Sequence, residues 1–412
     1  MRSKGRVDGV RETEKKGARG MRWSIVADDL TGAADAAAPF AAAGLRTCVV
    51  LEPVLLPKRY GCVALDAEAR WRTADEAAER IANFVAKLRD ADGLMLKVDS
   101  TLRGYVGAMV KAAWQASRRH WVLFAPAVPT QGRLVRDGKL FVHETPFHQS
   151  PFAAEPPAPI TDPRIAHRLE TTGLVGRQLF HASLAAVRNP QRLRQLFARA
   201  ISLRACVVAD AETEDDLRQL VATAMAMERP PLWVGAMGLA KAIAAFVTGD
   251  WIAPKWQPAK RVLCVVGSPN PVSLRQWQTL QRHGAVGLTL APPLRRELPA
   301  EGIVAIRLVG LDKIVQTMTP QLRHRYLRSW LTSWLRLTPT DALVLVGGFT
   351  ARVVVDVLRA TRLEVFGELE AGVPFGIFVR RRGVPLLCAL KAGGFGTPMT
   401  LQRVAQKLLA SP

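Results

Sequence analysis

The stretch WSIVADDLTGAADAAAPFAAAGLRTCVVL, residues 23–51, decides the fold. It opens with an apolar run typical of a buried strand, and residues 47–51 form a second run of the same kind. Between the two runs, an alanine-rich segment with Thr31 as its cap and Gly44 as its stop predicts a helix over residues 31–43. Strand, helix and strand in this order predict a βαβ unit, the building block of a parallel sheet.

The same alternation continues to about residue 250. Further strand runs are predicted at residues 93–99, 121–126, 207–210 and 231–238, and further helices at about 105–119 and at 214–226. We therefore expect a doubly wound α/β domain over residues 21–250. Residues 251–260, which contain two prolines and two tryptophans within TGDWIAPKWQPAKR, have no clear period and suit a linker.

A second α/β domain is predicted over residues 261–412. Its strands are RVLCVV (261–266), ALVLV (342–346) and PLLCAL (385–390), and a glycine-containing turn and a helical pattern follow each of them. The sequence has no repeat of fixed period, so a solenoid is excluded. The expected architecture is two doubly wound α/β domains with mostly parallel sheets and a cleft between them.

The net charge of this 412-residue chain is +22, with 57 basic and 35 acidic residues. An excess of this size raises three possibilities, namely nucleic acid, an anionic membrane or a small anionic ligand. The excess is +4 in residues 1–20, +6 in residues 21–260 and +12 in residues 261–412, and no block of five consecutive basic residues forms a nucleic-acid arm. We interpret residues 1–20 as a disordered basic tail, and Met21 as a candidate start of the working protein.

The five cysteines form no CxxC pair, and at least three lie within apolar strand runs. This usage predicts reduced core cysteines in a cytoplasmic protein. No apolar stretch reaches the roughly 18 residues that a membrane helix needs. Residues 1–20 lack the apolar core of a secretory signal. We expect no membrane and no nucleic-acid partner, and the oligomeric state stays open, a homodimer included.

Ligands of open α/β sheets bind beyond the carboxyl ends of the strands, so the residues that follow each strand are the first candidates. Asp28 and Asp29 follow the first strand and can accept hydrogen bonds from sugar hydroxyls or act as a base. The structural alternative is that Asp28 caps the next helix and Asp29 is solvated.

LKVDSTLRG, residues 96–104, gathers cations and hydroxyls where a strand turns toward a helix, an arrangement that suits a carboxylate ligand. Arg70 could add a bidentate contact to the same carboxylate. The structural alternative pairs Lys97 with Asp99 and leaves Ser100 as a helix cap. The candidate residues here are Arg70, Lys97, Asp99, Ser100, Thr101 and Arg103.

The last third of the chain carries different chemistry. GSPNPVS (267–273), GGFT (347–350) and KAGGFG (391–396) place small residues and hydroxyls after strands, where backbone N–H groups can hold phosphate oxygens. The chain contains neither GxxxxGK[ST] nor GxGxxG, so a Walker kinase and an ordinary dinucleotide fold are not indicated. His143 and His148 have no matching cysteine, and no metal site of protein side chains is predicted.

Nine ordered motifs resemble the four-carbon acid sugar kinases, and the resemblance covers nearly the whole chain from residue 21. They are ADDLTGAAD (27–35), LKVDSTLRG (96–104), APAVPTQGR (125–133), VVADAETEDDL (207–217), VGAMGLA (234–240), GSPNPVS, LVGGFTA (345–351), GELEAGVP (367–374) and KAGGFG.

The resemblance implies an N-terminal sugar-acid domain, a C-terminal ATP domain, and Mg²⁺-assisted transfer of the γ-phosphoryl group to the terminal hydroxyl of threonate, erythronate or a 3-oxo-tetronate. Asp28 or Asp29, Arg70 and the segment from Lys97 to Arg103 would hold the sugar acid, and Asp29 is the candidate that orients or deprotonates the attacking hydroxyl. The implied ATP-binding residues are Ser268, Gly347, Gly348, Thr350, Gly393, Gly394 and Gly396.

Two residues depart from the family's pattern. Phe349 stands where relatives commonly carry Asp, and Met399 stands where an acidic residue is frequent. If either acid holds Mg²⁺ or nucleotide in relatives, the ATP site here is altered. A rival hypothesis is therefore a non-catalytic sugar-acid-binding or sensor protein, and nucleic-acid binding is a third, motivated only by charge.

Overall fold

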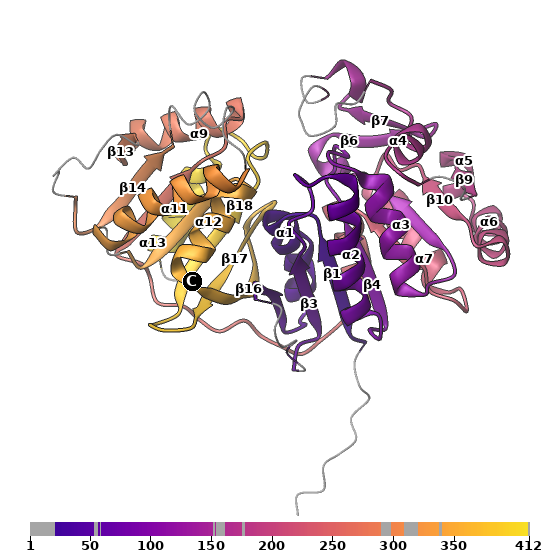
Figure 1. Ribbon diagram of the computed structural model, residues 1–412, viewed down its shortest axis with the longest axis horizontal. Coiled ribbons are helices and arrows are strands. Elements are labelled where there is room, and N and C mark those ends of the chain that lie inside the picture. The colour runs from indigo at the N-terminus through magenta and orange to yellow at the C-terminus, as the bar shows by residue number, and fades with distance from the viewer. Residues whose placement is uncertain are drawn as a thin grey trace, which may run out of the picture.

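The computed structural model describes residues 21–52, 57, 59–150, 153, 161–174, 178–289, 298–308, 320–337 and 340–410. The described chain is an α/β structure built on one large sheet (Figure 1). The predicted basic tail, residues 1–20, lies outside the described residues.

Eight parallel strands form the N-terminal part of the sheet. In spatial order they are β9 (Leu179–Ala182), β10 (Cys206–Ala209), β5 (Val122–Ala125), β11 (Leu232–Gly235), β4 (Gly93–Lys97), β1 (Trp23–Ala27), β3 (Cys62–Asp66) and β2 (Thr47–Val50). Their residues are almost all buried, because helices cover both faces of a parallel sheet. The predicted strand 23–27 is confirmed at both ends, and the order of the strands makes β1 and β4 neighbours at the centre.

Five parallel strands form the C-terminal part. They are β13 (Val286–Thr289), β14 (Gly302–Arg307), β12 (Arg261–Val266), β15 (Ala342–Val346) and β18 (Leu386–Lys391). A long hairpin of β16 (Ala360–Glu370) and β17 (Val373–Arg380) joins the two parts, since β17 pairs antiparallel with β18 and β16 pairs antiparallel with β2. The predicted mostly parallel α/β fold is confirmed, and this antiparallel bridge is a feature that the sequence analysis did not predict.

Helices lie on both faces of each part. In the N-terminal part, α1, α7 and α8 contact one another in series on one face, and α2, α3 and α4 do so on the other. The helices are α1 (Leu30–Ala42), α2 (Ala74–Leu88), α3 (Val106–Ser117), α4 (Ile165–Thr171), α5 (Leu184–Val187), α6 (Pro190–Leu203), α7 (Glu214–Met225), α8 (Met237–Ala244), α9 (Pro271–Arg282), α11 (Pro320–Leu337), α12 (Gly348–Leu358) and α13 (Thr400–Leu409). The short turns η1 (Pro129–Gln131) and η2 (Phe147–Gln149) flank a small sheet of β6 (Arg133–Arg136), β7 (Lys139–Val142) and β8 (Thr145–Pro146).

Helix α1 is buried on nearly all sides. It packs on β1 and β3, on β16 of the hairpin and on α8, and its alanine-rich composition permits these close approaches. In the C-terminal part the strands alternate between two cores: Leu263 and Val265 of β12 face the core shared with α12, whereas Cys264 faces the core shared with α13. Because α1 contacts both parts of the sheet, it lies where they meet.

The predicted linker, residues 251–260, contains no helix or strand. Its two tryptophans pack against the bridge, Trp251 with Phe366 and Trp256 with Phe375. All five cysteines are free and buried, as predicted. None of the helices in the described ranges is long and apolar enough to cross a membrane.

Candidate active site

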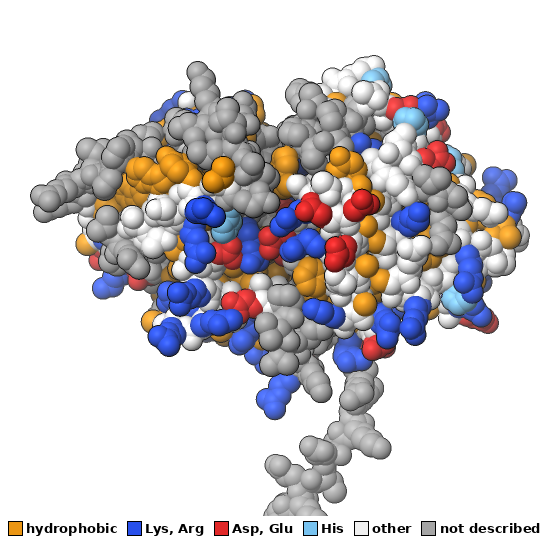
Figure 2. Space-filling model, in the orientation of Figure 1, with side chains coloured by type: hydrophobic (Ala, Val, Ile, Leu, Met, Phe, Trp, Pro, Cys, Tyr) orange, Lys and Arg blue, Asp and Glu red, His pale blue; other side chains and the backbone are white. Residues whose placement is uncertain are grey.

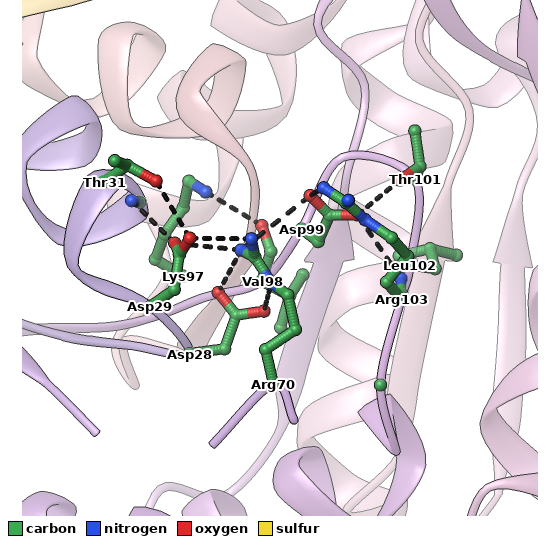
Figure 3. Close-up of polar contacts among 12 residues, drawn as sticks. Asp28, Asp29, Thr31, Arg70, Lys97, Val98, Asp99, Thr101, Leu102 and Arg103 are labelled. Atoms are coloured by element: carbon green, nitrogen blue, oxygen red, sulfur yellow. Dashed lines mark hydrogen bonds and ion pairs between the residues drawn. The ribbon is translucent and has the colours of Figure 1, made fainter. Parts of the chain in front are cut away.

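The predicted charged residues of the N-terminal part come together beyond the carboxyl ends of β1, β3 and β4 (Figure 3). Arg70, from the loop after β3, binds both carboxylates that follow β1. Its Nε and Nη2 donate to Asp28 at 2.8 Å each, and its Nη1 and Nη2 donate to Asp29 at 2.7 and 2.9 Å. Arg70 therefore fixes the two carboxylates, and its predicted contact with a substrate stays a prediction.

Asp29 is the N-cap of α1, which begins at Leu30. The N–H of Gly32 donates to Asp29 Oδ1 at 2.7 Å, and the Thr31 hydroxyl donates to Oδ2 at 2.8 Å. The predicted cap, Thr31, was wrong, because the aspartate two residues earlier reaches the free N–H groups first. Although burial alone would raise its pKa, Arg70, Lys97 and the Gly32 N–H lower the pKa of Asp29, which is ionised at neutral pH.

The segment after β4 forms a second network. Arg103 binds Asp99 through Nε at 2.7 Å and Nη2 at 2.9 Å, and the Thr101 hydroxyl also donates to Asp99. Burial opposes ionisation, but Arg103 and Arg70 hold the pKa of Asp99 well below its usual range. Lys97 donates to the Val98 carbonyl at 3.0 Å rather than pairing with Asp99.

Ser100 is buried but caps no helix, because α3 begins at Val106 with Tyr105 at its N-cap position. Both parts of the structural alternative for this segment are therefore wrong. Lys97 also lies beside Asp29, since a Cβ atom placed on Gly32 would be 3.1 Å from Lys97 Nζ and 2.7 Å from Asp29 Oδ1.

The buried charges of these two networks balance: three aspartates face two arginines and one lysine. The side chains of Asp28, Asp29 and Asp99 are 0%, 14% and 10% exposed, and that of Arg103 is 26% exposed. Asp29 is thus the most exposed of the three carboxylates, and Arg103 is a cation that a ligand can reach. A hydroxyl can approach the first and an anionic group the second.

The three glycine-containing turns of the C-terminal part follow β12, β15 and β18 and lie close together. A Cβ atom placed on Gly393 would lie 2.0 Å from Ser268 Oγ, and one on Gly347 would lie 3.5 Å from Ser268 Cβ. Gly347 has φ of 103°, a conformation that favours glycine. Thr350 is buried behind Gly267, while Gly394 and Gly396 continue the third turn. Backbone N–H groups can approach a phosphate here without side chains in between.

The two clusters meet at one point. A Cβ atom on Gly348, the first residue of α12, would lie only 2.5 Å from Asp29 Oδ2 and 3.2 Å from Thr31 Oγ1. The N-termini of α1 and α12 therefore approach each other with the Asp29 carboxylate between them. Both helix ends carry partial positive charge, which favours an anion at this junction.

Arg352 links the same two parts a turn farther along α12. Its Nη2 binds Asp356 at 2.8 Å within the helix, and its Nε lies 3.4 Å from Glu68 in the loop that carries Arg70. Figure 2 shows acidic and basic side chains interleaved over the middle of this face, where α12 and α2 lie in Figure 1. The loop that holds Arg70 is thus tied to the helix that begins at Gly348.

Lys391 and a large cavity were missed from the sequence. Lys391, the first residue of KAGGFG, is fully buried, and its Nζ donates to the Ala392 carbonyl at 2.8 Å. Burial lowers its pKa to about 7.

A cavity of about 1460 Å³ lies between α1, α8, the hairpin turn and the third glycine turn. It is lined by Gln131, Arg133, Lys241, Glu368, Gly394 and Gly396, among others. The motif APAVPTQGR was the available signal for Gln131 and Arg133.

The two unusual residues lie at the ends of helices. The Phe349 ring packs edge-on against His324 with centroids 6.4 Å apart, and Met399 occupies the N-cap position of α13 with no side-chain cap. Within the described ranges, no three His, Cys, Asp or Glu side chains are grouped closely enough to hold a metal ion.

Two families match this chain: one described as a sugar-binding N-terminal domain, over residues 23–243, and one described as a nucleotide-binding C-terminal domain, over residues 312–401. The chain is 32% identical to the D-threonate kinase of Cupriavidus necator, over 95% of this chain and 99% of that protein. It is 28% identical to the 3-oxo-tetronate kinase of Methylobacterium radiotolerans, over 90% of this chain and 95% of that one. A solved structure from Salmonella typhimurium, described as a putative tRNA synthase, shares the fold with a TM-score of 0.75 at 21% identity, covering 94% of this chain and 99% of that one.

Proposed function

Since this chain belongs to the family of four-carbon acid sugar kinases, we propose that it transfers the γ-phosphoryl group of ATP to the terminal hydroxyl of a four-carbon sugar acid. The observation that carries the proposal is the junction of Asp29 with Gly348, where a site for a sugar hydroxyl and a site for phosphate share one boundary. The kinase names of the relatives favour this activity over a non-catalytic sugar-binding protein.

We assign nucleotide binding to the C-terminal part, residues 261–412, and sugar-acid binding to the N-terminal part, residues 21–250. The converging turns offer N–H groups and the hydroxyls of Ser268 and Thr350 to phosphate oxygens. The large cavity, which Gly394 and Gly396 line, has room for the rest of the nucleotide. Among the described residues we assign no ligand to Mg²⁺; bound to the phosphates, Mg²⁺ would neutralise part of their charge.

The sugar acid lies, in this proposal, against the networks of Asp29 and Arg103. Arg103 is the most exposed of the candidate cations and faces the carboxylate of the substrate. D-threonate is the first substrate to test, because its kinase from C. necator is 32% identical whereas the 3-oxo-tetronate kinase is 28% identical.

Asp29 is assigned the role of orienting the attacking hydroxyl and taking its proton. Its two oxygens already accept four hydrogen bonds, from Gly32, Thr31 and twice from Arg70, which fills a carboxylate's capacity. The Thr31 hydroxyl can leave by turning one bond, and the substrate hydroxyl then takes its place on Oδ2.

The hydroxyl oxygen bonds to the γ-phosphorus as the bond from that phosphorus to the β–γ bridging oxygen breaks. Its proton passes to Asp29, and ADP leaves. In a loose transition state the attacking hydroxyl has formed little of its bond to phosphorus, so a strong base is not needed. A carboxylate of lowered pKa, which is a weak base, is therefore sufficient. The buried and unpaired cysteines fit a reducing compartment, and we place the reaction in the cytoplasm.

A coupled assay for ADP release tests the proposal. The purified chain is presented with D- and L-threonate, D- and L-erythronate and their 3-oxo forms, each with MgATP. We expect turnover that depends on one of these acids and exceeds the background hydrolysis of ATP. Equal ADP release with and without every acid would contradict the proposal.

A further inference from the structure

A small pocket at the amino-terminal edge of the N-terminal sheet gathers cations. It has a volume of about 370 Å³ and is lined by Trp114, Gln115, Arg118, Arg119, His120 and Arg204. Arg229 joins it by contacting both ring nitrogens of His120, at 2.9 and 2.8 Å. We call these residues the arginine pocket. Its cations lie just before β5, β10 and β11, whereas the active site lies beyond the carboxyl ends of the same parallel sheet.

Among the described residues, no carboxylate lines the arginine pocket. Arg118, Arg119, Arg204 and Arg229 make no ion pair with any acid in the part of the chain that the structure describes, although many other arginines of the molecule do. Arg119 donates to the carbonyls of Ala91 and Asp92 at 2.8 and 3.2 Å, and its Nε is buried with no partner among the described residues. The carboxylate of Asp92 offsets part of the charge of Arg119, but the four arginines outnumber it, and an excess of like charge is stabilised by a bound anion.

Two of these arginines stand where glycine is the usual residue. Arg118 ends α3 with φ of 58°, and Arg204 ends α6 with φ of 49°. A side chain is strained in this left-handed conformation, and glycine is not. Cations are favourable at helix C-termini, which gives a purely structural account of both arginines. That account does not explain why the two helices end at one pocket together with two more arginines and a histidine.

We propose that the arginine pocket binds a small phosphate-bearing anion of at least two negative charges. A guanidinium group can donate two parallel hydrogen bonds to two oxygens of one phosphate, and the pocket contains several such groups. Its volume of about 370 Å³ suits a small molecule. The Trp114 ring is buried and its Nε1 donates to the Arg119 carbonyl at 2.9 Å, so it fixes the pocket wall rather than stacking on a nucleobase. Pyrophosphate should therefore bind at least as tightly as ADP. This inference does not depend on the proposed function.

The His120 ring reports binding directly. Burial, Arg229 and Arg204 lower its pKa, and an anion beside these arginines would raise it. Proton–carbon NMR of the histidine rings in the full chain, with His120 assigned through His120→Gln, is recorded against pH without ligand, with pyrophosphate and with ADP. His324, which contacts Phe349 near the proposed nucleotide site, serves as an internal report on binding there.

Arg118→Gly and Arg204→Gly are the test variants, because glycine keeps both helix ends unstrained. Arg359→Gly is the matched control, since Arg359 ends α12 in the same conformation, with φ of 51°, away from the pocket. We expect pyrophosphate to raise the pKa of His120 and each test variant to weaken this binding about tenfold, with no change for the control.

Three results would overturn the proposal. One is an unchanged His120 titration at pyrophosphate concentrations up to about 10 mM in low salt. The second is an equal loss of binding in Arg359→Gly, which would indicate only overall charge. The third is a His120 response to a short duplex DNA but not to pyrophosphate, which would make the pocket part of a nucleic-acid surface.

Discussion

Replacing Gly348 by alanine places a methyl group where the two parts of the chain meet. The added Cβ would lie 2.5 Å from Asp29 Oδ2, whereas real Cβ atoms essentially never come closer than 3.0 Å, so the carboxylate or the end of α12 must move by at least about 0.5 Å. Overpacking of this kind costs about 1–3 kcal/mol of unfolding free energy, against a gain of up to about 1 kcal/mol from the better helix former.

The same displacement affects catalysis. Misplacing reacting groups by about 1 Å can cost about a hundredfold in rate, so a shift of half that size should lower kcat about tenfold. The assay is the ADP-release assay for kcat, together with chemical denaturation for stability. Gly394→Ala is the control for stability, because its Cβ would meet Asn270 at an ordinary 3.4 Å.

A double-mutant cycle isolates the contact. In an Asp29→Ala background the 2.5 Å contact is gone and only the milder contact with the rotatable Thr31 hydroxyl, at 3.2 Å, remains, so Gly348→Ala should cost much less, giving a coupling energy of at least about 1 kcal/mol. The reasoning would be refuted if Gly348→Ala cost the same stability in both backgrounds, because the methyl group would then clash with something other than Asp29.

Three further predictions concern single side chains. Asp29→Asn keeps an N-cap but loses the charge, so kcat should fall by about a hundredfold or more while the KM for ATP changes little; unchanged turnover would leave Asp29 only a cap. Arg352→Gln should raise the KM of both substrates and lower the free energy of unfolding by about 1 kcal/mol, measured by steady-state kinetics and denaturation, because it unties α12 from the Glu68 loop; a change in only one KM would contradict that link. Asp35 is buried with Oδ1 unpartnered, and burial raises its pKa to about 7, so the folded chain keeps a proton that the unfolded chain releases between about pH 4 and 7. Stability is therefore lost progressively as pH rises from about 4 to about 7, and Asp35→Asn should raise the melting temperature clearly more at pH 8 than at pH 5; an equal effect at both would contradict the assignment.

Much of the fold could be predicted because its strands are unbroken apolar runs. Residues 23–27, 261–266 and 342–346 are strands with the predicted bounds, since complete burial leaves a continuous signal in the sequence. The bridge of β16 and β17 gave a weaker signal, because half-buried positions interrupt the buried ones in both strands and charged residues fill several of them. Its pairing with β2 joins residues about 300 positions apart, which no local pattern reports.

The location of the candidate site could be predicted from the sequence, but its hydrogen-bond partners could not. The rule that ligands bind beyond the carboxyl ends of strands brought Asp28, Asp29, Arg70 and the Lys97 segment together correctly. The positions of these residues in the sequence could not show that Arg70 donates hydrogen bonds to Asp28 and Asp29, because these bonds depend on the path of the loop after β3. The contact of Gly348 with Asp29 could not be predicted either, because it depends on how α1 and α12, which are far apart in the sequence, pack against each other.

The most direct test of the central claim is the proton-coupled phosphorus NMR spectrum of the product formed from MgATP and the sugar acid that is turned over. Transfer to the terminal hydroxyl predicts a phosphate monoester resonance split into a triplet by the two protons of a CH₂ group, with one equivalent of ADP. A doublet would place the phosphate on a secondary hydroxyl. Inorganic phosphate alone would contradict transfer to the sugar acid altogether.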